Sequence, residues 1–207
     1  NEGVELNSGA DFITVSGNIS NYGNGILGTG IITLDKAGDA ILFGDTLSCA
    51  ATIEVASGTT LSSNGLLKLT ATAANQYGQL VGEGDVVGAV SIQSFLDGIG
   101  LNQARYFYLG APTTDTEISD FNEGNILKAA NNNTGTIWQW DADNANWEAP
   151  NSINDIATNG RGYAIFAGTT NNGTFLRGDA GIITLTGTVP MTDVQSSLEY
   201  HNGQGVS

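Results

Sequence analysis

Two tryptophans in the second half of the chain are the residues best suited to contact a ligand. Trp138 and Trp140 are two residues apart, so in a β-strand both side chains lie on the same face. Flat aromatic rings on one face can form a platform on which sugar rings stack. Large aromatic side chains also commonly fill a protein core. Exposed and coplanar rings at Trp138 and Trp140 would favour the carbohydrate-binding hypothesis over the core one.

Acidic residues are densest just after these tryptophans. Asp141, Asp143 and Glu148 offer carboxylate oxygens, which are the ligands that calcium takes in protein loops. The segment lacks the glycine and the terminal glutamate at the spacing of an EF-hand loop. Residues 141–146 have the composition of a hairpin tip between strands that carry Trp140 and Trp147. The sequence predicts a solvated tip of this kind, with Asp141 and Asp143 as candidates for an opportunistic calcium site.

Residues that could carry other chemistry are sparse. His201 is the single histidine and Cys49 the single cysteine, which makes a zinc site implausible, and the Gly-x-Ser-x-Gly motif does not occur. The apolar neighbours of Cys49 indicate a small buried side chain. A glycosidase needs two carboxylates about 5 to 10 Å apart, and nothing selects one pair among the 21 acidic residues. We expect no enzymatic activity and no cofactor, calcium excepted.

The charge balance limits the classes of partner. Against 21 acidic residues stand six basic ones, and the formal net charge of the 207 residues is −15. Such a surface repels the phosphates of nucleic acids and the headgroups of anionic lipids. No stretch approaches the ~18 consecutive apolar residues of a membrane span. We therefore expect no nucleic-acid partner and no membrane insertion.

The elements that position these residues are short β-strands. Apolar pairs with a spacing of two alternate with clusters of Gly, Asn, Ser and Thr, the pattern of half-buried strands separated by turns. The pairs are Ile13/Val15, Ile32/Leu34, Ile53/Val55 and Leu67/Leu69. Their second members are 19, 21 and 14 residues apart. This spacing suits the coils of a β-solenoid over residues 1–95.

A hairpin meander is the competing interpretation of the same region. Asn24-Gly25 and Asn64-Gly65 are strong hairpin signals between alternating apolar residues. Residues 59–61 and 67–69 would then pair antiparallel across Asn64-Gly65. We favour the solenoid, because the apolar pairs are too short and too widely spaced for a regular meander.

Beyond Gln93 the sequence pattern changes, and it predicts longer strands rich in aromatic residues. These strands are expected at residues 105–109, 137–140, 163–166, 174–176, 182–189 and 194–200, with a short helical turn within 115–123. Bulky side chains of this kind suit strands packed face to face. The predicted fold is thus all-β, with a short β-solenoid-like N-terminal region followed by a β-sandwich over residues 96–207.

Several segments resemble repeats of large surface proteins of Bacteroidota that the type IX secretion system exports. The matching segments are residues 51–69, 105–112, 138–141 with Trp147, 160–166 and 184–189. The resemblance implies a secreted, cell-surface protein that acts in adhesion or in building a coat or filament. It also implies a C-terminal sorting domain beyond Ser207. Asp45-Thr46-Leu47 is similar to the O-glycosylation acceptor of this phylum, which makes Thr46 a candidate glycosylation site.

The leading functional hypothesis is an extracellular structural or adhesive protein of the bacterial cell surface. Its partners would be further copies of itself, other cell-surface proteins and glycans. Self-assembly into a filament or layer is included, with residues 1–15 as a donor or pairing strand, because the edges of a stacked β structure recruit further strands. The alternative is a carbohydrate-binding module that uses exposed aromatic side chains. A polysaccharide-degrading enzyme is the third hypothesis.

Overall fold

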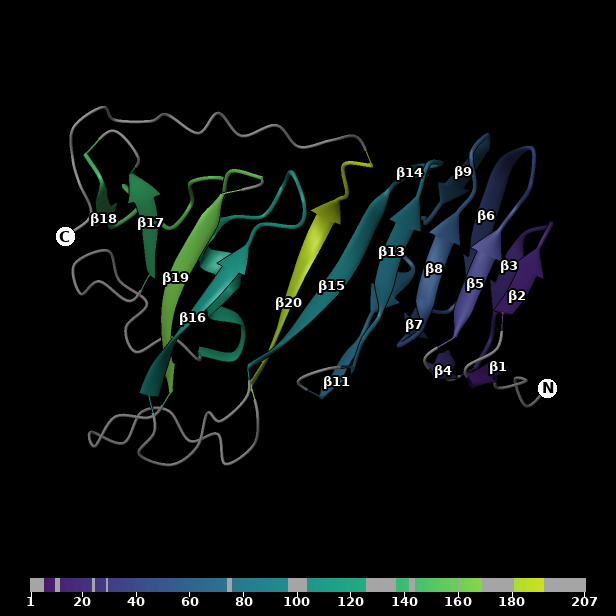
Figure 1. Cartoon of the computed structure of the whole chain (residues 1–207), viewed down its shortest axis with the longest axis horizontal. Coiled ribbons are helices and arrows are strands. Elements are labelled where there is room, and N and C mark those ends of the chain that lie inside the picture. Colours follow the sequence, from purple (N-terminus) through teal and green to yellow (C-terminus); the bar gives the residue numbers. More distant parts are fainter. Residues whose placement is uncertain are drawn as a thin grey trace.

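A computed structural model of the chain describes residues 6–9, 12–23, 25–28, 30–73, 76–96, 104–125, 137–141, 144–159, 161–168 and 181–191. The molecule is elongated (Figure 1). Stacked rows of short strands form its N-terminal end, and a separate antiparallel sheet forms the opposite end.

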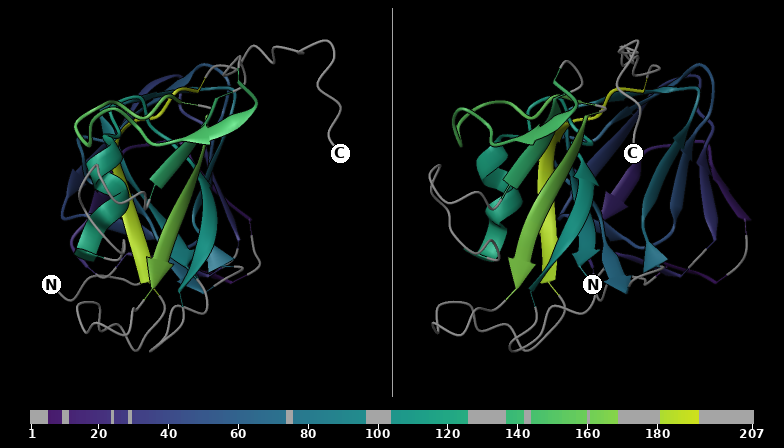
Figure 2. Two further views of the ribbon diagram at one scale, coloured as in Figure 1. Left: turned by 90° about the vertical axis from the view of Figure 1, so that its left-hand side faces the viewer. Right: turned by 60° about the vertical axis from the view of Figure 1, so that its left-hand side comes forward.

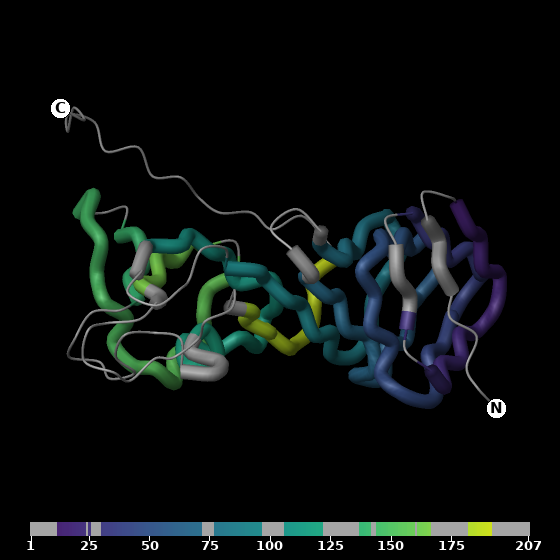
Figure 3. The backbone as a smooth tube through the Cα atoms, turned by 90° about the horizontal axis from the view of Figure 1, so that it is seen from below, coloured from purple at the N-terminus to yellow at the C-terminus, as the bar shows by residue number. Residues whose placement is uncertain are grey.

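The N-terminal half is a three-sided β-solenoid, as Figure 3 shows along its side. The first row consists of β1 (Leu6–Gly9), β2 (Phe12–Val15) and β3 (Ile19–Asn21). The second consists of β4 (Ile26–Gly28), β5 (Ile31–Leu34) and β6 (Gly38–Gly44), and the third of β7 (Leu47–Cys49), β8 (Thr52–Val55) and β9 (Thr59–Ser62). The fourth consists of β10 (Leu67–Leu69), β13 (Gln79–Gly82) and β14 (Asp85–Val87). A small hairpin, β11 (Ala71–Ala73) and β12 (Gln76–Tyr77), interrupts the fourth row.

The strands of each face pair in parallel and in register. Ile13 pairs with Ile32, and Ile32 pairs with Ile53, so the three side chains form a column across the rows. Val15, Leu34 and Val55 form a second column in the same way. Aliphatic side chains of successive rows therefore stack on one another in the interior, where Leu34 and Val55 have no exposed surface. The solenoid prediction is confirmed, and the spacings of 19 and 21 residues are true repeats.

The third predicted spacing, from Val55 to Leu69, is wrong. Val55 pairs with Gly82 on β13, whereas Leu69 pairs with Cys49 on a different face. The β11–β12 hairpin lies between β10 and β13 and lengthens this repeat. Leu67 and Leu69 nevertheless point into the core as their spacing predicts.

Asn64-Gly65 forms a corner of the solenoid, not a hairpin. Asn64 has a φ of 52° and Gly65 a φ of 72°, and this bend carries the chain from β9 to β10, which belong to different sheets. Asn64 Nδ2 donates a hydrogen bond of 2.9 Å to the backbone oxygen of Leu42 in the row before. The hairpin alternative is therefore wrong for this segment.

Glycine is required at the corner that ends β6. Gly44 has a φ of 86°, and a Cβ there would lie 2.1 Å from the carbonyl oxygen of Asn21. Gly58 has nearly the same φ of 82°, but a Cβ there would meet nothing within 4 Å. We predict that Gly58→Ala lowers the free energy of unfolding by about 1 kcal/mol through backbone strain alone. Gly44→Ala should lower it by about 2 to 4 kcal/mol, because overpacking adds to the strain.

Equilibrium denaturation of the two variants checks this prediction. Because the two glycines have nearly the same positive φ, Gly58→Ala is a matched control for the strain component. Equal losses of stability would contradict the close approach of adjacent coils at Gly44.

The C-terminal half continues from β15 (Ala89–Leu96), which lies beside β10 in the solenoid. Its other elements are β16 (Ala104–Gly110), the 3₁₀-helix η1 (Ile118–Asn125), β17 (Ile137–Asp141), β18 (Asn146–Glu148), β19 (Gly162–Gly168) and β20 (Gly181–Thr188). Four of these strands form an antiparallel sheet in the order β16-β19-β17-β18, here called the terminal sheet. β20 instead returns to pair antiparallel with all eight residues of β15.

A second core fills the space under the terminal sheet. Tyr163 and Ile165 from β19 pack there with Phe121 from η1 and with Ile183 and Leu185 from β20. Figure 2 shows η1 and β20 next to each other on this side of the molecule. The inner face is thus covered by a helix and by the last strand of the solenoid sheet. The predicted independent β-sandwich is not confirmed in the described residues.

Several predicted elements are present in the second half. The helical turn expected within 115–123 is η1, the strand expected at 182–189 is β20, and residues 141–146 connect the paired strands β17 and β18. The predicted domain boundary between residues 95 and 96 falls inside β15, whose Leu96 belongs to the second core. Residues 174–176, 194–200 and His201 lie outside the described residues.

Candidate functional site: an aromatic groove on the terminal sheet

The register of the terminal sheet sorts its side chains onto two faces. On the inner face, Leu109 pairs with Tyr163, and Phe107 and Ile137 both pair with Ile165. These side chains pack in or against the second core. The alternate positions therefore face outward.

The outward positions are rich in aromatic residues. They include Tyr106 and Tyr108 on β16, Trp138 and Trp140 on β17, and Trp147 on β18. Both tyrosines, Trp140 and Trp147 are exposed, and Trp138 is half-buried. The alternative that Trp138 and Trp140 fill a core is not what the structure shows.

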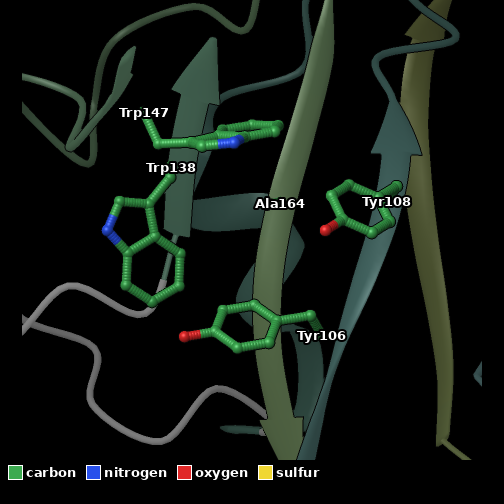
Figure 4. A pocket seen from close by; sticks show the side chains of 5 residues that line it. All are labelled: Tyr106, Tyr108, Trp138, Trp147 and Ala164. Atoms are coloured by element: carbon green, nitrogen blue, oxygen red, sulfur yellow. The ribbon is translucent and has the colours of Figure 1, made fainter. Parts of the chain in front are cut away.

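A groove of about 330 Å³ lies among these rings. Tyr106, Tyr108, Trp138 and Trp147 surround it, and Ala164 on β19 is beneath (Figure 4). Ala164 pairs with Tyr108 on one side and with Trp138 on the other. The small side chain of Ala164 leaves the space over β19 into which the rings of the neighbouring strands lean.

Contacts between rings fix the shape of the groove. The centroids of Tyr106 and Trp138 are 5.5 Å apart with an interplanar angle of 52°, and those of Tyr108 and Trp147 are 5.9 Å apart at 44°. Such tilted pairs stabilise one another by about 0.5–1.5 kcal/mol each beyond the burial of their surface. These contacts favour the arrangement of the rings that encloses the groove.

The sequence identified this surface only in part. Trp138 lines the groove, whereas Trp140 does not and instead meets Trp147 edge to face, with centroids 5.4 Å apart and an angle of 70°. The two predicted residues thus form no coplanar platform. Tyr106, Tyr108 and Trp147 were missed, although the period of two in residues 105–109 could have paired the two tyrosines.

Polar contacts hold the outer strands in place beside the groove. Arg161 donates from Nε and Nη2 to the carbonyl oxygen of Trp140, at 3.2 and 2.7 Å. Gln139 Nε2 donates to Glu148 Oε1 at 2.8 Å and links β17 to β18. These bonds fix the hairpin that carries Trp140 and Trp147.

Asp141, one of the two candidate calcium ligands, ends β17 in the same hairpin. Asp141 Oδ2 accepts a hydrogen bond of 2.6 Å from Asn144 Nδ2, and Oδ1 accepts one of 3.3 Å from the Asn144 amide. Asp141 thus acts as a turn-forming side chain here. Asp143 lies outside the described residues, among which no cluster of three potential metal ligands occurs. Calcium binding at Asp141 and Asp143 stays a prediction.

Thr46 lies at an exposed corner between β6 and β7. Its backbone oxygen accepts a hydrogen bond of 2.9 Å from Asn21 Nδ2 of the row before. The corner is thus anchored through the backbone of Thr46. Glycosylation of Thr46 stays a prediction.

Cys49 is buried in the solenoid core, as its neighbours predict. Burial raises the pKa of the thiol from its ordinary value of 9.0 to about 11, and a backbone hydrogen bond of Ala51 opposes this only in part. The neutral thiol therefore stabilises the fold below pH 9, and this contribution is lost as the pH rises towards 11. We predict that the free energy of unfolding of the wild type falls over this range, relative to that of Cys49→Ala, by on the order of 2 kcal/mol.

Denaturant titrations of the two proteins at pH 8 and pH 10.5 measure this difference. Tyrosine ionisation is common to both proteins and cancels in the comparison. A difference in stability that does not change with pH would contradict the burial of the thiol.

Comparison with known proteins gives no identity for the chain. No family model, no curated protein and no solved structure matches it. No helix in the described part of the chain is long and apolar enough to cross a membrane.

Proposed function

We propose that this protein is an extracellular adhesive module that binds neutral carbohydrate through the groove on its terminal sheet. The observation that carries the proposal is the ring of four aromatic side chains around Ala164, which contact one another in two pairs. The sequence resemblance to exported surface proteins supports a location at the bacterial cell surface.

Carbohydrate suits the chemistry of the groove. A sugar whose hydroxyls are equatorial has two faces of C–H groups, which gain contact with aromatic rings while the hydroxyls remain solvated. Tyr106 and Tyr108 also carry hydroxyls and the two tryptophans carry indole N–H groups, so the rim offers hydrogen-bond partners for a sugar. The volume of about 330 Å³ is at the lower end of the range of small-molecule sites.

Charge favours a neutral ligand over an acidic one. None of the five side chains that line the groove is Asp, Glu, Lys, Arg or His, and the chain as a whole has a net charge of −15. A uronic acid or a sulfated sugar would approach an acidic molecule without a cation in the groove wall to offset the repulsion. We therefore propose uncharged hexose polymers or glycans as the ligand class.

The solenoid supports an adhesive role by its shape. Its rows are joined by continuous parallel ladders on three faces, and the terminal sheet, which carries the groove, lies at the opposite end of the long axis (Figure 1). A stacked body of this kind holds a binding face at a fixed distance from whatever its other end contacts.

A glycan array followed by isothermal titration calorimetry tests the proposal. Binding to neutral glycans is expected, and Trp138→Ala should weaken it at least about tenfold, or about 1.4 kcal/mol. Tyr22→Ala is the control, because it removes an exposed aromatic side chain from the solenoid and leaves the groove unchanged. Absence of binding to every neutral glycan, or an equal loss in both variants, would refute the proposal.

A further inference from the structure

Aromatic rings stand on all four sides of the floor of the groove. Tyr108 and Trp138 lie on opposite sides of Ala164, because both pair with it in the sheet. The ring of Tyr106 closes one end of the floor and the ring of Trp147 closes the other (Figure 4). Tyr106 on β16 contacts Trp138 on β17, and Trp147 on β18 contacts Tyr108 on β16, so both contacts cross over β19. The groove is thus closed at both ends.

The width of the groove suits a single layer of ligand. β16 and β17 lie on opposite sides of β19, so the backbones that carry Tyr108 and Trp138 are two strand spacings, or about 10 Å, apart. Van der Waals contact needs about 4 Å between the atoms of a wall and those of a ligand. One layer between two walls needs two such contacts, about 8 Å, whereas two layers need three, about 12 Å. One sugar ring therefore fits between the side walls and two do not.

The closed ends decide which sugar of a glycan can enter the groove. A sugar within a chain has a neighbour on each of two sides, and the neighbours would have to pass through the walls at both ends. A sugar at the end of a chain or branch has a single neighbour, which can lie outside the rim. The rim faces solvent, since Tyr106 and Tyr108 are 54% and 72% exposed.

We infer that the groove binds one terminal sugar of a neutral glycan and excludes the sugars within a chain. This inference rests on the proposed function and adds the mode of binding to it. The rest of the glycan extends from the rim into solvent. The affinity therefore depends on the terminal sugar and not on the length of the chain behind it.

Two glycines allow Trp147 to close its end of the groove. Trp147 pairs with Trp140, and the register of β17 with β19 places Trp140 opposite Gly162. Gly162 in turn pairs with Gly110, so this row of the outer face has no side chain on β16 or β19. A Cβ on Gly162 would meet nothing within 4 Å. The indole of Trp147 extends over this row to Tyr108.

Trp147 is therefore the residue that sets the length of the groove. Without its indole, the floor would continue from Ala164 over the exposed Gly162 and Gly110. A second sugar would then have room to lie on the two glycines. The opposite end is different, because Tyr106 packs there on Phe166, with ring centroids 4.9 Å apart.

Calorimetry with neutral oligosaccharides of two lengths tests the inference. The probes are the disaccharide and the hexasaccharide of linear glucans, mannans and galactans. In each series that binds the wild type, the two dissociation constants should agree within about threefold. A hexasaccharide that binds more tightly than this would overturn the inference and leave the proposed function in place. Failure of every probe to bind would also overturn the inference, and the glycan array then shows whether the proposed function fails with it.

Trp147→Ala tests the role of the end wall. The measured quantity is the ratio of the two dissociation constants, because a uniform loss of affinity leaves this ratio unchanged. In Trp147→Ala the hexasaccharide should bind at least about fivefold more tightly than the disaccharide, since the second sugar gains contacts of its own. Trp138→Ala is the matched control, because it removes an indole from a side wall and should weaken both ligands equally. An unchanged ratio in Trp147→Ala, with circular dichroism showing an intact fold, would overturn the assignment of Trp147 as the end wall.

Discussion

Ala164→Leu is expected to abolish binding of neutral oligosaccharides while every aromatic residue of the groove remains in place. Ala164 lies under the groove between Tyr108 and Trp138. Three added carbon atoms would occupy the space of a sugar ring within a groove of about 330 Å³. The expected loss of affinity is at least about a hundredfold, because a side chain that occupies the ligand's space costs several kcal/mol of binding free energy.

Calorimetry with the best neutral ligand measures the effect. Ala37→Leu is the matched control, since Ala37 lies at an exposed corner of the solenoid. Near-ultraviolet circular dichroism, to which the stacked rings contribute, verifies that the groove is intact in both variants. Unchanged affinity of Ala164→Leu would show that the ligand binds elsewhere.

Leu34→Ala is expected to cause the largest loss of stability among single truncations in the solenoid. Leu34 has no exposed surface and stacks between Val15 and Val55 in the middle of the core column. Leucine-to-alanine substitutions at such sites cost about 2 to 5 kcal/mol, because the cavity cannot collapse between rows of fixed spacing. Val81→Ala, at an exposed position of the same sheet, should cost less than about 0.5 kcal/mol.

Two probes in one denaturation experiment also test how the two cores are coupled. Far-ultraviolet circular dichroism reports mainly on the strands of the whole molecule. Tryptophan fluorescence reports on the terminal sheet, because all three tryptophans of the chain lie there. β15 and β20 pair along eight residues and connect the two cores, so both signals should shift together in Leu34→Ala. A shift in circular dichroism alone would contradict this coupling.

The solenoid could be predicted because its signal is local. Each apolar pair, such as Ile32 and Leu34, places two side chains on one face of one strand, and the next coil repeats the pattern. The prediction failed at Val55, because Leu67 and Leu69 belong to the face of β7, and the β11–β12 hairpin moves the true partner of Val55 to Gly82. Asn64-Gly65 could not distinguish a solenoid corner from a hairpin turn. Both structures need residues with positive φ, and both therefore favour the same dipeptide.

The terminal sheet shows what a local signal leaves undetermined. Alternation in residues 105–109 defines two faces, but only the packing of η1 and β20 decides which face is covered. β20 pairs with a strand about 90 residues earlier in the chain, a contact that no short pattern encodes. For this reason the sequence indicated Trp138 as a binding residue but not its neighbours in the groove, Tyr106 and Trp147.

The indole N–H signals of the ¹⁵N-labelled protein test the central claim most directly. The chain has three tryptophans, so three such signals are expected, and titration with a neutral oligosaccharide can be followed at each. We predict that the signals of Trp138 and Trp147, which line the groove, shift in a saturable manner with the same dissociation constant that calorimetry gives. Indole signals that stay unchanged at saturating ligand would contradict the assignment of the groove as the carbohydrate-binding site.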